Sequence, residues 1–196
     1  MLNLNIYLVR ERVGWLKMSD VYDLFDPATG TQVGICIEEP PGWVKLAKFL
    51  VNKMMLPTSV RVLEGADQTG RTLAVLTKGF TFIGASARVM DGNRRLLGSL
   101  SRSGFSLRRY FQILGPDGVE MACVKGDWKG WNFAVSDPSG VVWGTITKKW
   151  AGIGKELFTS ADNYVVDLQG TTSIPERKIL VLCTALAIDV LFKERG

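Results

Sequence analysis

The stretch from Lys178 to Phe192 reads KILVLCTALAIDVLF, and it decides how the rest of the chain folds. From Ile179 onward it contains a single charge, Asp189, and neither Gly nor Pro. Pro175 and Glu176 stand just before it, and a proline in a first turn with an acidic neighbour at the positive end of the dipole indicates a helix start. The sequence therefore predicts a helix here that is apolar on all sides.

Such a helix suits either a membrane or the interior of a protein. A spanning helix needs about 20 apolar residues to cross roughly 30 Å of hydrocarbon. At about 1.5 Å per residue, the run from Ile179 to Phe192 reaches only roughly 21 Å. Asp189 would also be costly near the bilayer centre. We therefore favour a helix surrounded by protein, with a membrane anchor as the alternative.

The rest of the chain repeats one hairpin pattern. Two apolar or alternating runs flank a turn rich in Asp, Gly and Pro, which are the residues that tight hairpin turns require. The five hairpins cover residues 21–39, 60–78, 85–101, 109–125 and 133–149. Together with Leu4–Val9 and Tyr164–Leu168 they make twelve strands, whose regular spacing indicates a barrel or a sandwich. Inward side chains no longer fill a barrel of more than about eight strands, so we expect the apolar helix to fill it.

One further segment departs from the strand pattern. Residues 42–56 place their apolar side chains at helical spacing, with lysines on the other side. The apolar stripe consists of Trp43, Leu46, Ala47, Leu50, Val51 and Met54. This predicts an amphipathic helix that packs on its own protein, with an interfacial helix lying on a membrane as the alternative.

Composition restricts the function classes. The chain has 196 residues, no histidine and a formal net charge of +5. Without histidine, Ser-His-Asp and Cys-His catalysis are excluded, so we expect no enzyme. Cys36, Cys123 and Cys183 are far apart among apolar neighbours, which is typical of buried free thiols in a reducing compartment. The N-terminus lacks the features of a secretory signal, so we expect a cytoplasmic protein, in keeping with the thiols.

Residues 150–166 contain WAG and ELFTSADNYVV, which resemble the late motif of phospholipid scramblases, and the terminal helix ending IDVLF resembles theirs. The spacing Tyr22-x-x-x-Asp26-x-x-x-Gly30 is shared with the plant LURP-one-related proteins. Both groups belong to the Tubby C-terminal-like superfamily. The resemblance implies one domain, residues 1–196, folded as a mainly β, twelve-stranded antiparallel barrel around a central hydrophobic C-terminal helix. The residues expected to form this plug are Ile179, Leu180, Leu182, Leu186, Asp189 and Phe192.

The resemblance also suggests functions. Scramblases are linked to calcium-dependent movement of phospholipids between leaflets, and Tubby domains bind phosphoinositides. We therefore expect a non-enzymatic module that binds anionic phospholipid or phosphoinositide headgroups at a membrane surface. A soluble protein-interaction or structural domain without a ligand is one alternative, and calcium-dependent scrambling is another. The sequence identifies no protein partner and no oligomeric state. We expect no nucleic-acid partner, because the mild positive charge has no recognisable cluster.

Paired basic residues near hairpin ends are the candidate ligands for a lipid headgroup. Lys and Arg together can satisfy a multiply charged headgroup. The candidates are Arg94, Arg95, Arg108, Arg109, Lys148 and Lys149. In a strand, neighbours point to opposite faces, so each pair offers one residue per face. The alternative is that these charges discourage pairing between strand edges.

The resemblance implies a calcium site close to the last strand. Asp162 and Asn163 match the scramblase motif, Ser160 replaces its first Asp, and Asp167 is a further candidate. Calcium prefers six to eight oxygen ligands, several of them carboxylates. The alternative is that Ser160, Asp162 and Asn163 cap and turn a loop between strands.

Overall fold

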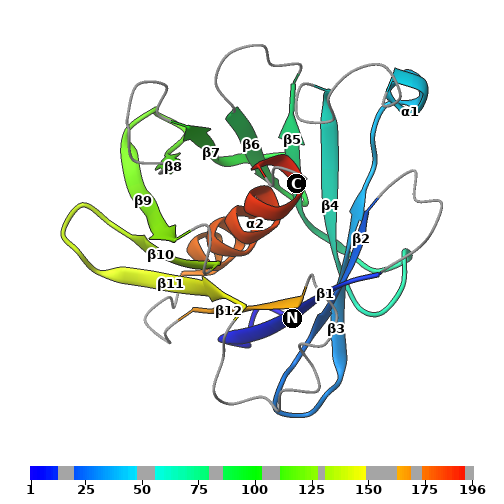
Figure 1. Ribbon diagram of the computed structural model, residues 1–196, viewed down its shortest axis with the longest axis horizontal. Coiled ribbons are helices and arrows are strands. Elements are labelled where there is room, and N and C mark those ends of the chain that lie inside the picture. The colour runs from blue at the N-terminus through cyan, green and yellow to red at the C-terminus, as the bar shows by residue number, and fades with distance from the viewer. Residues whose placement is uncertain are drawn as a thin grey trace.

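Twelve antiparallel strands close into a barrel around one long helix in the computed structural model (Figure 1). The structure describes residues 1–12, 20–47, 56–79, 86–102, 111–127, 131–148, 163–168 and 174–192. The strands are β1 (Ile6–Glu11), β2 (Val21–Phe25), β3 (Gln32–Glu38), β4 (Thr58–Glu64), β5 (Thr72–Lys78), β6 (Ser86–Asp91), β7 (Leu96–Arg102), β8 (Phe111–Leu114), β9 (Glu120–Asp127), β10 (Asn132–Ser136), β11 (Val142–Thr147) and β12 (Asn163–Asp167). The helices are α1 (Gly42–Ala47) and α2 (Pro175–Phe192). The predicted mainly β fold is confirmed.

Every strand pairs with its neighbours in the sequence, and β1 pairs with β12 to close the ring. Because consecutive strands are antiparallel, the connections alternate between the two ends of the barrel. We call the hairpin end the one that carries the β2–β3, β4–β5, β6–β7, β8–β9 and β10–β11 turns. The remaining connections between strands begin and end at the opposite end. Because the ring is closed, none of the twelve described strands is an edge strand that could recruit another chain.

Local chemistry accounts for the turns at the hairpin end. In the β10–β11 turn, Asp137 Oδ1 accepts hydrogen bonds from the backbone N–H groups of Ser139 and Val141, both at 3.0 Å. Gly140 follows with a φ of +89°, a conformation that a side chain would disfavour. In the β8–β9 turn, Asp117 Oδ1 accepts from the Val119 N–H at 3.1 Å, and the intervening Gly118 has a φ of +81°. These are the turns that the sequence pattern predicted.

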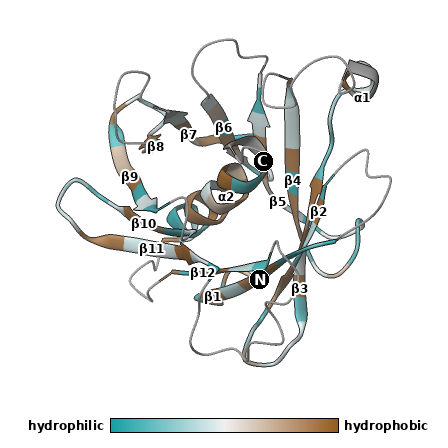
Figure 2. Ribbon diagram, viewed as in Figure 1, coloured by the Kyte–Doolittle hydropathy of each residue, from teal (hydrophilic) through white to brown (hydrophobic). Residues whose placement is uncertain are grey.

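The α2 helix fills the barrel interior. Its residues from Lys178 to Asp189 are all buried, and it contacts β5, β6, β7, β11 and β12. The helix and the strands facing it form one apolar core, which appears brown in Figure 2. Glycine permits the close approach: a Cβ on Gly144 would lie 3.0 Å from Val181 Cγ1 and 2.7 Å from the Asp167 carbonyl oxygen.

The predicted plug residues Ile179, Leu180, Leu182, Leu186 and Asp189 are confirmed as buried, while the Phe192 side chain lies outside the described residues. Among the described residues, no helix has both the length and the apolarity required to span a membrane. The burial of α2 among the barrel strands confirms the prediction of a helix enclosed by protein.

The amphipathic helix is described only from Gly42 to Ala47, and residues 48–55 lie outside the described residues. The predicted apolar stripe began at Trp43, but this side chain is 57% exposed, whereas the adjacent Val44 is buried. Helical spacing shows which residues share a stripe. Tertiary packing decides which part of the helix surface faces the protein.

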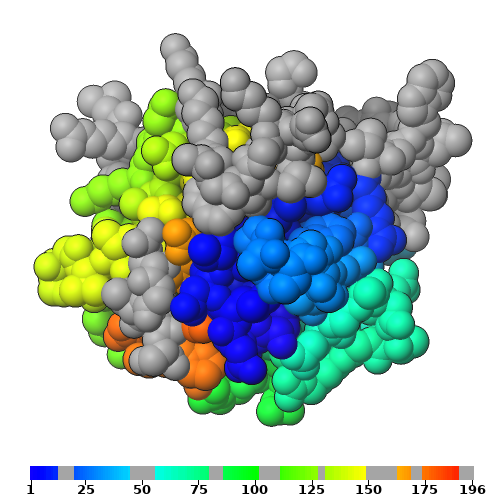
Figure 3. Space-filling model, turned by 90° about the horizontal axis from the view of Figure 1, so that it is seen from below, coloured from blue at the N-terminus to red at the C-terminus, as the bar shows by residue number. Residues whose placement is uncertain are grey.

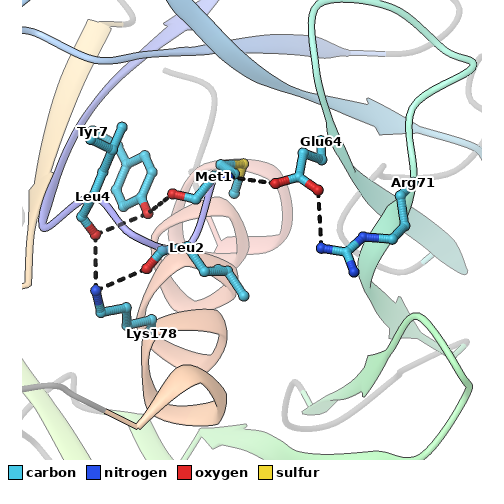
Figure 4. Close-up of polar contacts among 7 residues, drawn as sticks. All are labelled: Met1, Leu2, Leu4, Tyr7, Glu64, Arg71 and Lys178. Atoms are coloured by element: carbon cyan, nitrogen blue, oxygen red, sulfur yellow. Dashed lines mark hydrogen bonds and ion pairs between the residues drawn. The ribbon is translucent and has the colours of Figure 1, made fainter.

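The segment before β1 is bound to the start of α2 (Figure 4). Lys178 Nζ donates to the carbonyl oxygens of Leu2 and Leu4, at 2.9 and 3.1 Å, and to Asn5 Oδ1 at 3.0 Å. The Met1 ammonium group contacts Glu64 of β4 at 2.5 Å. In Figure 3 the orange start of α2 reaches the surface beside these dark-blue residues. The segment before β1 thereby contacts both the helix start and β4.

We predict that Leu186→Ala lowers the free energy of unfolding by about 2–5 kcal/mol, because it leaves a cavity at a fully buried position of α2. Chemical denaturation monitored by circular dichroism measures this change. Val119→Ala, which truncates an exposed side chain, is the control and should change stability by less than about 0.5 kcal/mol. Equal effects of the two substitutions would contradict the central role of α2.

Candidate functional site

The candidate lipid ligands lie at both ends of the barrel. Arg94 and Arg95 belong to the turn between β6 and β7, at the hairpin end. Lys148 follows β11 at the opposite end, where its Nζ lies 4.6 Å from the centroid of the Trp131 ring. Arg108, Arg109 and Lys149 lie outside the described residues. The described candidates therefore do not form a single cluster, and the role of each in lipid binding stays a prediction.

The two arginines of the β6–β7 turn differ in their contacts. Arg95 Nε donates to Asp91 Oδ2 at 3.0 Å, and Arg95 Nη2 donates to Glu176 Oε1 at 3.1 Å. Arg94 is exposed, has a φ of +65° and makes no ion pair with any described residue. Arg94 is therefore the one available to an incoming anion, while Arg95 is already bound by two carboxylates.

Exposed apolar side chains gather at the same end of the barrel. Five of the six large hydrophobic side chains exposed in the described part of the chain lie here, and the sixth is Trp43 on α1. We call this set the apolar rim: Leu96, Val119, Val141, Val142 and Ile174. Soluble proteins seldom expose apolar side chains in groups, and such groups usually mark an interaction site.

The order of the strands brings the apolar rim together. Its residues lie at the tips of three hairpins that are neighbours in the barrel, β6–β7, β8–β9 and β10–β11, and just before α2. The first turn of α2 contacts both outer hairpins, because Glu176 pairs with Arg95 and the Arg177 guanidinium lies 4.7 Å from the centroid of the Trp143 ring. The start of the helix thus links the outer two of the three tips.

Charges surround the apolar rim. Four cations (Arg94, Arg95, Arg177 and Lys178) and five carboxylates (Asp91, Asp117, Glu120, Asp137 and Glu176) lie on the same tips and on the first turn of α2, a formal net charge of −1. The turns keep some of these acids ionised. The Ser139 hydroxyl, followed by the N–H of Val141, lowers the pKa of Asp137. The backbone N–H of Arg95 does the same for Asp91.

The opposite end of the barrel contains a buried polar arc that the sequence analysis did not identify. It consists of the buried residues Asp20, Glu38, Thr58 and Lys78 and the half-buried Glu11, from the ends of five neighbouring strands. Within the polar arc, Glu38 Oε1 accepts from the Thr58 hydroxyl at 2.9 Å, and Glu38 Oε2 accepts from the Asp20 N–H at 3.1 Å. Burial, with Asp189 of α2 as the next cause, raises the pKa of Tyr22 beneath it.

The signal for the polar arc was present in the sequence. In each strand the inward, apolar alternation continues by one step into a polar residue, as from Cys36 to Glu38 or from Leu76 to Lys78. This signal becomes visible only once the strands are placed side by side, because each step by itself resembles the end of a strand.

Two of the four candidate calcium ligands lie within the described residues. Asn163 begins β12 and Asp167 ends it, where they pair with Arg10 and Ile6 of β1. Four residues along a strand span about 13 Å, which is far more than two ligands of one calcium ion can span. Ser160 and Asp162 lie outside the described residues. In the described part of the chain, no group of three or more Asp, Glu, Cys or His residues is placed to hold a metal ion.

Comparison with known proteins agrees with this architecture. A protein-family model with the description Scramblase matches residues 19–195. The chain belongs to the scramblase family. The match begins just before β2 and extends through α2, so it includes eleven of the twelve strands of the barrel. Neither the curated proteins nor the solved structures include a significant match to this chain.

We predict that Glu38→Ala lowers the free energy of unfolding by about 2–4 kcal/mol, because it leaves the Thr58 hydroxyl and the Asp20 N–H without their acceptor in a buried site. Urea denaturation measures the change. Glu39→Ala is the adjacent control, since it removes only an exposed ion pair with Arg61 and should cost less than about 1 kcal/mol. Similar losses of stability in both variants would show that the buried hydrogen bonds of Glu38 stabilise the protein no more than an exposed ion pair does.

Proposed function

We propose that this scramblase-family protein is a non-enzymatic module that docks on a phospholipid membrane with the hairpin end of its barrel. The observation that carries the proposal is the apolar rim, with the exposed guanidinium of Arg94 beside it. The sequence predicted an anionic phospholipid or phosphoinositide partner. The proposal keeps a phospholipid but does not require an anionic one, and the contact surface is now one end of the barrel rather than all six basic residues.

The rim has the features of a surface that enters a membrane interface. Its side chains lie on projecting hairpin tips, so they can reach into the boundary between headgroups and acyl chains. Burying a half-exposed Val or Leu contributes about 1–2 kcal/mol at roughly 25 cal/mol per Å². Arg94 lies next to Leu96, at the level where a lipid phosphate could accept its N–H groups.

Trp43 provides a control for this orientation. It is exposed to nearly the same degree as Val119 of the rim, 57% against 62%. It follows β3, however, and so belongs to the opposite end of the barrel. If exposed apolar area alone caused adsorption to lipid, both positions would contribute. Docking by the hairpin end requires only the rim.

We predict that Val119→Ser combined with Val141→Ser weakens binding to phosphatidylcholine vesicles about 30-fold or more, since two apolar contacts are lost. Vesicle flotation with quantified protein measures the partition. Trp43→Ala should bind like the unchanged protein.

Two results would contradict the proposal. If Trp43→Ala loses binding and the double variant keeps it, the opposite end faces the lipid. If the unchanged protein binds no phospholipid vesicle of any composition, membrane docking is wrong, and the rim is then a surface for another protein.

A further inference from the structure

We infer that Glu176 determines which lipids the rim accepts, by holding Arg95 away from lipid phosphate. The inference rests on the proposed docking of the hairpin end. Glu176 lies in the first turn of α2, and its Oε1 accepts from Arg95 Nη2 at 3.1 Å. Among the described residues this ion pair is the one that joins α2 to a hairpin tip.

The two contacts of Arg95 have different consequences. Its Nε bonds Asp91 Oδ2 within the same turn, where Asp91 also accepts the backbone N–H groups of Asn93 and Arg95 through Oδ1. That contact is part of the turn and is retained on a membrane. The contact with Glu176 instead crosses from one element to another, and the Arg95 side chain is 64% exposed. A lipid phosphate that approaches the rim therefore competes with Glu176 for Nη2.

The location of the pair makes this competition matter for docking. Arg95 directly precedes Leu96 and Glu176 closely follows Ile174, so each partner adjoins a member of the apolar rim. Insertion of the rim would bring both to the level of the phosphates. Glu176 then opposes an anionic surface in two ways, because its own charge repels the surface and its carboxylate occupies Arg95.

The net charge of the side chains around the apolar rim predicts which vesicles the protein prefers. With five carboxylates against four cations, of which Lys178 is buried and bound to backbone carbonyls, the hairpin end docks through apolar contacts and Arg94, and it favours zwitterionic over anionic vesicles. A charge near an anionic surface contributes about 1 kcal/mol, which is about fivefold in partition. Removing the Glu176 charge should raise the partition onto anionic vesicles by one such factor, and releasing Arg95 to a lipid phosphate should raise it by a second.

Glu120→Gln is the matched control for Glu176→Gln. Glu120 begins β9 at the same end of the barrel, and its carboxylate accepts from Gln112 Nε2 at 2.7 Å rather than from an arginine. Both substitutions replace a carboxylate by an amide of the same shape, and each removes one negative charge from the hairpin end. Only Glu176→Gln releases Arg95.

The experiment compares binding to phosphatidylcholine vesicles with binding to vesicles containing about one-third phosphatidylserine, at about 0.1 M salt. On the anionic vesicles we expect about fivefold tighter binding for Glu120→Gln and about 25-fold for Glu176→Gln. On phosphatidylcholine both should stay within about twofold of the unchanged protein. Adding Arg95→Gln to Glu176→Gln should remove the extra gain.

Stability does not obscure this comparison. The exposed pair between Arg95 and Glu176 contributes at most about 1 kcal/mol, so the variant is expected to remain folded. Equal gains for Glu176→Gln and Glu120→Gln would overturn the inference and leave membrane docking in place. A gain that persists in the variant with Arg95→Gln would also overturn it. Absence of binding by the unchanged protein to both vesicles would overturn the docking proposal and this inference with it.

Discussion

Burial of α2 inside the barrel is the constraint on which the rest of the structure depends. A ring of twelve strands encloses more space than its inward side chains can fill, and the helix supplies the missing apolar volume. Gly98 and Gly144 let the strands approach the helix closely, so the packing is specific rather than a loose filling. The apolar sequence of α2, which suggests a membrane span by hydropathy, is the interior of a folded domain.

The same helix makes the two ends of the barrel different. At the hairpin end, its first turn is held by Lys178, by the pair of Glu176 with Arg95, and by Arg177 over Trp143. At the opposite end, Asp189 lies near the buried polar arc and the tyrosine beneath it. One element therefore supports both the core and the surface that we propose for membrane docking. A change at Glu176 can alter that surface while leaving the core intact.

Much of the fold could be predicted from sequence because its signals are local. Asp, Gly and Pro mark the turns, alternation marks the strands, and the length of the last apolar run argues against a membrane span. The candidate site could be predicted only in part. Arg94 and Arg95 were identified, but their separation from Lys148 follows from strand direction, and the apolar rim arises from residues up to 78 positions apart, Leu96 and Ile174. The burial of Val44 in α1 could not be predicted, because it depends on how the helix packs on the barrel. The polar arc could not be predicted either, because its residues come from five different strands.

The sequence by itself determined five hairpins and an enclosed apolar helix in a mainly β fold, because turn chemistry and hydrophobic periodicity act over a few residues. The local pattern left a barrel or a sandwich open, and the family resemblance implied the barrel. Only the tertiary structure decided which charges meet. Arg95 and Glu176 are 81 residues apart, and Glu38 and Thr58 belong to separate hairpins. Their contacts exist because closure of the ring brings distant turns and strand ends together around the helix. What an exposed arginine can bind is then decided by which carboxylate lies next to it.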